Sequence, residues 1–304
     1  MRQPPYLSAG DTVAVVATAR SVAHKDIQCA VDHLREWGFN VLVGQSIGAV
    51  HHQFAGPDHL RAQDLQWALD HPEIKAIWCA RGGYGTVRII DALDFSRFEQ
   101  HPKWIIGYSD ITVLHNHLHQ MNWTSIHAQM PLQLETKSPL TASSIREVLT
   151  GQPYGIAYTN QSDYARSGNV EAMVVGGNLS ILYSLLGSPS TINTEGKILF
   201  IEDLDEYLYH IDRMLVNLGR NGMFAGLAGL IIGGFTDMKD HKIPFGAEAF
   251  DLIWSAVAAH DFPVSFGMPA GHLQDNQALP LGVPCTLEVT PQSTSLAFRG
   301  HGQS

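Results

Sequence analysis

Apolar residues follow two alternating patterns through the first half of the chain. Four short runs rich in Val, Ile and Ala have the length and composition of strands buried on both faces: residues 12–17, 40–43, 76–80 and 104–106. Four further segments repeat apolar residues at every third or fourth position, as on one face of a helix: residues 27–37, 58–69, 87–93 and 111–120. Asp58 stands where the N-cap of the second helix belongs. Repeated strand–helix units predict a parallel sheet with right-handed crossovers.

The second half of the chain has a different pattern, richer in strands. Strands are predicted at residues 154–158, 169–175, 198–201, 230–232, 286–289 and 295–298, with a helix at 247–260. The polar stretch 159–168 is typical of a linker. We therefore expect an α/β fold in two domains. Residues 1–158 would form a Rossmann-like or flavodoxin-like domain with a parallel sheet, and residues 169–304 a mixed, β-rich domain.

The charge of the chain narrows the classes of partner. Its 304 residues carry 29 acidic and 19 basic side chains, a formal net charge of −10, with no block of Lys or Arg. This disfavours a nucleic acid or an anionic membrane as partner. The longest uncharged segment, residues 221–236, is shorter than the roughly 20 apolar residues of a membrane-spanning helix.

The cysteine content and the N-terminal residues of the chain indicate its cellular compartment. Cys29, Cys79 and Cys285 cannot all pair, which favours a reducing compartment. The first apolar run, residues 13–17, follows Asp11 and not a basic stretch, so no signal peptide is expected. Together these features predict a cytoplasmic protein. The oligomeric state stays open, with a homodimer as one alternative.

Ser109 lies in the first segment that suggests chemistry. Residues 107–111, Gly-Tyr-Ser-Asp-Ile, join the strand at 104–106 to the next helix. Ligands gather at the carboxyl ends of parallel strands, and a Ser there receives the field of the helix N-terminus. The turn resembles a nucleophile elbow, although the glycine two residues after the Ser is missing. The alternative is that Ser109 only caps its helix.

A glycine-rich loop follows the neighbouring strand. Residues 81–85 read Arg-Gly-Gly-Tyr-Gly, so backbone N–H groups can approach and bind a phosphate or a developing oxyanion. The loop lacks the Gly-Lys-Ser/Thr ending of a P-loop and is no dinucleotide fingerprint. The alternative is a sharp turn that needs a positive φ.

An acid and a base can be selected from the second half. Glu202 ends an apolar strand and could orient a histidine, with Asp205 and Glu206 as rivals; the alternative is a solvated strand end. His272 follows Gly271 ahead of a polar loop, although any one of 16 histidines is more often without a catalytic role. Ser, Glu and His occur in the order nucleophile, acid, base that one class of hydrolases shares.

A metal site is the competing interpretation for another group of histidines. His115, His117 and His119 are close in sequence, and the first and last lie one helical turn apart. The Glu of a His-Glu-x-x-His pattern is absent. The sequence therefore favours a site without metal.

Over nearly its whole length, the chain resembles the LD-carboxypeptidases, serine peptidase family S66, which includes muramoyltetrapeptide carboxypeptidase and the microcin C immunity peptidase. The segments that carry the resemblance are Phe-Ala-Gly at 54–56, Arg-Gly-Gly-Tyr-Gly at 81–85, Gly-Tyr-Ser-Asp-Ile-Thr at 107–112, Gly-Gly-Asn-Leu at 176–179, Ile-Glu-Asp at 201–203, Asp-Arg at 212–213, Gly-His at 271–272 and Leu-Pro-Leu-Gly at 279–282. Many members have His-Gly-Pro where residues 127–131 read His-Ala-Gln-Met-Pro, a departure that concerns one wall of the substrate cleft.

The resemblance implies a catalytic triad and a substrate. Ser109 would be the nucleophile, Glu202 the acid and His272 the base, meeting between the two domains. The implied reaction is release of the terminal D-alanine of murein tetrapeptide across an L,D bond, without metal or organic cofactor. The alternatives are an immunity-type hydrolase of peptidyl- or aminoacyl-nucleotides, which would need an aromatic shelf for adenine, and a catalytically silent module that binds murein peptide.

Two further sets of residues complete the predicted site. The oxyanion is expected to meet the backbone N–H of Asp110 and that of Gly82 or Gly83. A carboxypeptidase must also recognise a chain end, and a fixed guanidinium facing a carboxylate does so most simply. We expect Arg81 or Arg213 to supply it and Asn178 to bond the peptide; alternatively, Arg213 pairs with a surface acid and Asn178 caps its helix.

Overall fold

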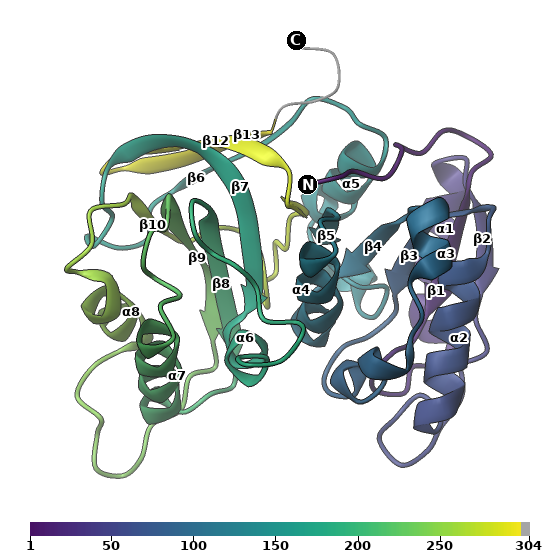
Figure 1. Cartoon of the computed structure of the whole chain (residues 1–304), viewed down its shortest axis with the longest axis horizontal. Coiled ribbons are helices and arrows are strands. Elements are labelled where there is room, and N and C mark those ends of the chain that lie inside the picture. The colour runs from purple at the N-terminus through teal and green to yellow at the C-terminus, as the bar shows by residue number, and fades with distance from the viewer. Residues whose placement is uncertain (299–304) are drawn as a thin grey trace.

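A computed structural model describes residues 1–298, which form two sheets that lie side by side (Figure 1). The first sheet has the order β11-β5-β4-β3-β1-β2. Its strands are β1 (Thr12–Val16), β2 (Asn40–Val43), β3 (Ile74–Cys79), β4 (Trp104–Gly107), β5 (Ser125–His127) and β11 (Leu279–Leu281). All neighbours in it pair in parallel except β11 and β5.

Helices cover both faces of the first sheet. They are α1 (Gln28–Glu36), α2 (Asp58–Asp70), α3 (Ser96–Gln100), α4 (Thr112–Gln120) and α5 (Pro139–Leu149). Val13 and Val15 of β1 pack into one apolar cluster with residues of α1, while Ala14 and Val16 pack into another with residues of α2. Burial on both faces explains why this strand has a continuous apolar run.

The second sheet is parallel in one half and antiparallel in the other, with the order β10-β9-β8-β7-β12-β13-β6. Its strands are β6 (Tyr154–Thr159), β7 (Gly168–Asn178), β8 (Ile198–Leu204), β9 (Gly229–Thr236), β10 (Val264–Phe266), β12 (Pro284–Val289) and β13 (Ser293–Phe298). The helices α6 (Leu179–Ser184), α7 (Leu208–Arg220) and α8 (Ala249–Val257) cover one face of the parallel half.

The predicted fold class is confirmed. However, each of the two predicted domains contributes one strand to the sheet of the other. β6 belongs to the second sheet, because it pairs with β13. β11, from late in the chain, pairs with β5 at the edge of the first. The C-terminal segment therefore ties the two halves together. The predicted second domain ends at residue 304, of which residues 299–304 lie outside the described part.

Two local predictions were wrong. Residues 87–93 form no α-helix but two 3-10 turns, Thr86–Arg88 and Ile90–Ala92, because their N–H groups bond three residues back after the turn at Gly85. Asp58 is not the N-cap of α2 but its first residue; Pro57 takes the cap position, and the Asp58 carboxylate accepts hydrogen bonds from Arg61 and Arg88.

Across residues 1–298, no helix has the length and apolar character needed to span a membrane. All three cysteines are free thiols, and Cys79 and Cys285 are buried.

Candidate active site

Residues at the carboxyl ends of β3 and β4 in the first sheet and of β7 and β8 in the second line a common cleft of about 510 Å³. Most of the residues predicted for the site line this cleft: Arg81, Gly82, Gly83, Ser109, Asp110, Asn178 and His272. Glu202 is buried beside His272, and Arg213 does not line the cleft.

Ser109 occupies a strained turn between β4 and α4. Its φ of +61° lies in the left-handed region, which a residue with a Cβ adopts at a cost of roughly 1–3 kcal/mol. No side-chain cap bonds the start of α4, so Ser109 does not serve as the cap of this helix. Gly107 permits the turn, since a Cβ there would lie 2.8 Å from the side chain of Ile111. A strained Ser between strand and helix is the geometry of a nucleophile elbow.

The glycine loop lies directly against this turn. A Cβ on Gly82 would lie 3.3 Å from the Cβ of Ser109 and 3.4 Å from the backbone N of Asp110. In the described residues, neither Gly82 nor Gly83 donates its N–H to a protein acceptor. The Asp110 carboxylate holds the far end of the loop by accepting from the N–H of Thr86 at 2.8 Å. The loop thus presents free donors beside the hydroxyl of Ser109.

Glu202, which is buried, and His272, which is partly exposed to the cleft, form an acid–imidazole pair. The Oε2 of Glu202 lies 2.7 Å from the Nδ1 of His272, and Glu202 is 0% exposed. Burial opposes ionisation of both groups. Their mutual attraction and hydrogen bond outweigh it, so the pKa of Glu202 lies below its ordinary value and that of His272 above. Gly271, at φ +102°, makes the approach possible, since a Cβ there would be 2.7 Å from Oε2 of Glu202.

The rival carboxylates are occupied elsewhere. Asp205 forms an ion pair with Lys239 at 2.6 Å, and Glu206 lies 2.6 Å from the Nδ1 of His210. Both line the cleft, but the structure records no contact between either and His272. Glu202 is the carboxylate that the fold brings to the imidazole.

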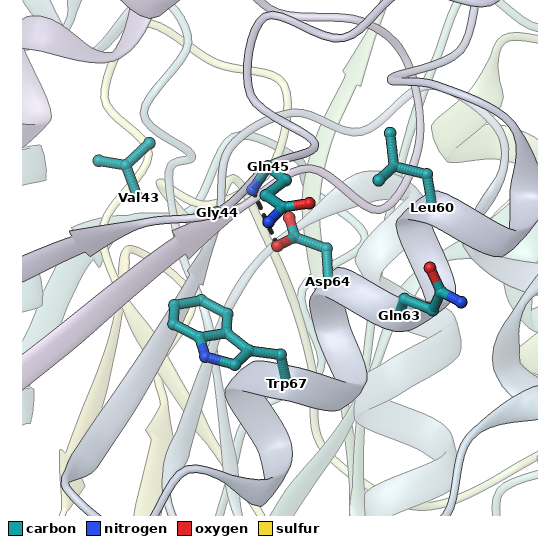
Figure 2. Close-up of a pocket in the computed structure, with 7 residues that line it drawn as sticks. All are labelled: Val43, Gly44, Gln45, Leu60, Gln63, Asp64 and Trp67. Atoms are coloured by element: carbon teal, nitrogen blue, oxygen red, sulfur yellow. Dashed lines mark hydrogen bonds between the residues drawn. The ribbon is translucent and has the colours of Figure 1, made fainter.

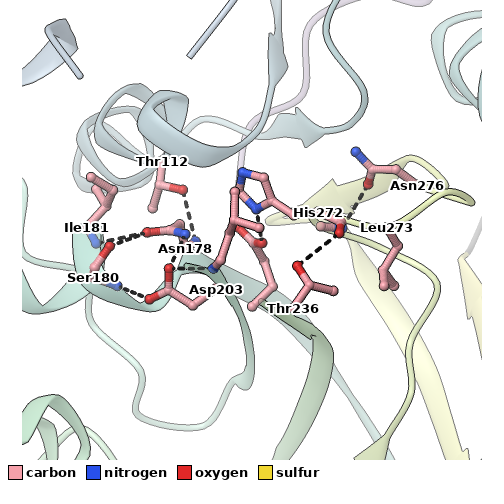
Figure 3. A network of polar contacts seen from close by, with 12 residues as sticks. Thr112, Asn178, Ser180, Ile181, Asp203, Thr236, His272, Leu273 and Asn276 are labelled. Carbon is pink, nitrogen blue, oxygen red and sulfur yellow. Dashed lines mark hydrogen bonds and ion pairs between the residues drawn. The ribbon is translucent and has the colours of Figure 1, made fainter. Parts of the chain in front are cut away.

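Asn178 and Asp203 join the two halves of the cleft through a polar network (Figure 3). The Asn178 side chain caps α6 by accepting from the N–H of Ile181, and it donates to Asp203 at 2.9 Å. Its backbone N–H donates to the hydroxyl of Thr112 on α4 at 3.0 Å. Burial, with the neighbouring Glu202 carboxylate, raises the pKa of Asp203 to about 7.

Sequence reasoning missed a buried amide pair behind His272. The Oδ1 of Asn276 accepts from the N–H of Gly271 at 2.8 Å, and its Nδ2 donates to Gln129 at 3.2 Å. Asn276 is 0% exposed. The pair ties the His272 loop to the segment after β5, and Met130 from that segment lines the cleft. Only the polarity of the loop 273–278 hinted at Asn276.

The two arginines predicted to bind a carboxylate have different surroundings. Arg81 lines the cleft and donates from Nη1 to the carbonyl oxygen of Ser21 at 2.5 Å. Arg213 is exposed, with its guanidinium 5.1 Å from the ring centre of Tyr209. Of the two predicted arginines, the structure thus brings Arg81 and not Arg213 to the cleft.

The histidines considered for zinc do not converge on a common point. The Nε2 of His115 bonds the carbonyl oxygen of Gly107 at 2.8 Å, and burial lowers the pKa of His115 and of His119 to about 3. Residues 1–298 contain no group of three His, Cys, Asp or Glu side chains placed to hold a metal ion.

A second hollow, of about 420 Å³, opens at the carboxyl end of β2 (Figure 2). Trp67 and Gln63 of α2 line it, together with Gln45, whose N–H donates to the Asp64 carboxylate at 2.9 Å. None of the residues predicted for the site lies here.

The chain matches known proteins over most of its length. Residues 13–128 match the LD-carboxypeptidase N-terminal domain, and residues 171–287 match the LD-carboxypeptidase C-terminal domain. The chain is 35% identical to the probable murein peptide carboxypeptidase of Bacillus subtilis, covering 98% of this chain and 95% of that one. It is 29% identical to the murein tetrapeptide carboxypeptidase of Pseudomonas aeruginosa, covering 91% and 92%.

A solved structure has the same fold. The muramoyltetrapeptide carboxypeptidase of Oxalobacter formigenes superposes with a TM-score of 0.85 at 27% identity, covering 96% of this chain and all of that one. The two domain matches lie in the first and second halves of the chain, and each of these relatives covers more than nine tenths of it. The chain belongs to the LD-carboxypeptidase family.

Proposed function

We propose that the protein is a serine carboxypeptidase that removes the terminal D-alanine of murein tetrapeptide by hydrolysing an L,D peptide bond. The observation that carries the proposal is that Ser109 and His272 line one cleft, with the buried Glu202 bonded to His272. Family membership and the names of the murein-peptide relatives support the substrate class. Three free thiols are compatible with action in the cytoplasm, and a homodimer remains an alternative to a monomer.

In the proposed mechanism, the Ser109 hydroxyl attacks the scissile carbonyl carbon while the Nε2 of His272 takes its proton. Glu202 keeps the other proton of the ring on Nδ1 and stabilises the imidazolium that forms. The N–H of Asp110 and that of Gly82 or Gly83 bind the oxyanion, each worth roughly 3 kcal/mol in the transition state. The imidazolium then protonates the departing amine of D-alanine, and water, deprotonated by His272, releases the peptide from Ser109.

Substrate recognition is proposed to use the cleft walls. Arg81 would bind the carboxylate of the last residue, as a guanidinium does best in a two-pronged contact. Asn178, which lines the cleft beside Asp203, would bond the peptide.

The experiment that tests this function is incubation of the purified protein with murein tetrapeptide, followed by mass analysis. We expect a product lighter by one alanine residue, and no such product from a tetrapeptide ending in L-alanine. A parallel incubation with an aminoacyl-nucleotide tests the immunity-type alternative. Cleavage of the nucleotide conjugate with the tetrapeptide left intact would contradict the proposal.

The acid limb of the pH profile should report His272. Only the neutral ring accepts the Ser109 proton, so kcat/KM should rise with pH through the pKa of His272, with a midpoint above the ordinary 6.5. In Glu202→Gln the attraction that raises this pKa is lost and burial lowers it, so the residual activity should have its midpoint below 6.5. Kinetics on the tetrapeptide from pH 5 to 9 measure both. A wild-type midpoint at or below 6.5, unmoved in the variant, would contradict the pairing.

Chelation should leave the rate unchanged. The proposed steps use only protein side chains and backbone N–H groups, so dialysis against EDTA is expected to retain full kcat on the tetrapeptide. Loss of activity that zinc restores would return His115 and His119 to consideration and would contradict the serine mechanism.

A further inference from the structure

Arg20 is an unassigned cation on the same wall of the cleft as the glycine loop. It follows β1 and donates its backbone N–H to the carbonyl oxygen of Gly82. Its side chain lies flat on Gly83, where a Cβ would be 2.6 Å from the Arg20 Cδ and 2.9 Å from its Nε. Among residues 1–298, no carboxylate forms an ion pair with Arg20. Its guanidinium is therefore available to a ligand.

Arg81 stands beside it and is held in place by the protein. Its Nη1 donates to the carbonyl oxygen of Ser21, the residue after Arg20. One nitrogen of Arg81 is thus fixed while its other N–H groups stay available. Two guanidinium groups from neighbouring loops line the cleft next to Gly82 and Gly83.

Covalent geometry decides where a terminal carboxylate must lie. In a peptide, the carboxylate carbon of the last residue is two bonds beyond the scissile nitrogen, so it lies within roughly 4 Å of the scissile carbonyl carbon. That carbonyl must sit at Ser109 with its oxygen toward the glycine loop. The group that binds the carboxylate must therefore adjoin Gly82 and Gly83, as Arg20 does.

The charge across the cleft gives the substrate a direction. The opposite wall is lined by Asp203, Asp205 and Glu206, and among the described residues that line the cleft the only lysines or arginines are Arg20 and Arg81. The leaving residue is thus drawn to the arginine wall, and the acyl part of the peptide extends past the acidic wall.

We propose that Arg20, together with Arg81, binds the terminal carboxylate of the substrate, which makes Arg20 a specificity-determining residue. The inference rests on the proposed carboxypeptidase function. It names the residue that would restrict cleavage to peptides with a free terminal carboxylate. A free guanidinium on each of two loops can hold both carboxylate oxygens.

The test compares the tetrapeptide with its C-terminal amide in wild type, Arg20→Gln, Arg20→Lys and Arg81→Lys. The control is Arg35→Gln, because Arg35 is an exposed arginine of α1 with only a 3.8 Å contact to Asp32. We expect Arg20→Gln to lower kcat/KM on the free acid by about 10- to 100-fold, the usual effect of losing a charge-assisted contact, and on the amide by less than about threefold. Arg20→Lys and Arg81→Lys should lose an intermediate amount on the acid, and Arg35→Gln should match wild type on both.

The outcomes separate the inference from the function. If wild type cleaves the free acid and Arg20→Gln cleaves it equally fast, the assignment of Arg20 is overturned while the function stands. Equal losses on acid and amide also overturn it, since Arg20 would then only support the loop. If wild type cleaves neither peptide, the function and the inference fail together. An unchanged thermal midpoint in Arg20→Gln confirms that a selective loss reflects recognition and not unfolding.

Discussion

Ser109→Ala is expected to lower kcat on murein tetrapeptide by about 10⁴-fold or more, the loss typical of removing a serine nucleophile. The substitution removes one oxygen atom at the cleft and leaves the oxyanion donors and the Glu202–His272 pair in place. Alanine has a Cβ like serine, so it adopts the left-handed turn at φ +61° with the same backbone strain. The fold should therefore be retained, with a thermal midpoint close to wild type. Steady-state kinetics and a melting curve measure the two effects.

The comparison with double variants makes this prediction sharper. Members of a triad act as a unit, so Ser109→Ala combined with His272→Ala should be hardly slower than Ser109→Ala alone. Retention of more than about a tenth of wild-type kcat in Ser109→Ala would rule out Ser109 as nucleophile. Multiplicative losses in the double variant would show that the two residues act independently.

Glu202→Gln should lower kcat by roughly 10³- to 10⁴-fold with little change in KM. The glutamine amide can donate to the Nδ1 of His272, which would leave the ring proton on Nε2, where it cannot accept the proton of Ser109. Glu202 is 0% exposed and lies 2.7 Å from the imidazole, so the isosteric glutamine should occupy the same place beside His272. Kinetics on the tetrapeptide measure the loss.

The rival carboxylates supply matched controls for this prediction. Asp205→Asn and Glu206→Gln also replace a carboxylate by an amide, at positions three and four residues after Glu202. The Asp205 side chain is paired with Lys239, and the Glu206 side chain with His210. Each should keep kcat within about tenfold of wild type. If either of them, and not Glu202→Gln, produced the large loss, the assignment of the acid would be wrong.

Local patterns predicted most elements because each depends on nearby residues. The apolar run of β1 and the three–four spacing of α4 are set by burial of particular faces, which periodicity reports. The two 3-10 turns after Gly85 have a similar apolar spacing, but their N–H groups bond three residues back instead of four. Periodicity cannot report that choice. Nor can it report that β11 crosses back to β5, since strand pairing between distant segments is fixed by packing of the whole fold.

The candidate site was predicted where chemistry and chain position coincide. Ser109 follows a strand at the sheet edge where ligands gather, and Glu202 ends another strand, so topology alone brings them near the cleft. Arg20 and Asn276 carry no such signal, because an arginine after a strand and an asparagine in a polar loop are common surface residues. Their roles follow from contacts with Gly83 and Gly271 that only the fold reveals.

Covalent labelling of the active serine tests the central claim most directly. A fluorophosphonate probe forms a stable adduct with a serine whose hydroxyl is activated by a base and whose oxyanion is bound. After incubation, intact-protein mass and peptide mapping should show one adduct on Ser109 in wild type, far slower labelling in His272→Ala and none in Ser109→Ala. An adduct on another residue, or equal labelling of Ser109→Ala and wild type, would contradict the account.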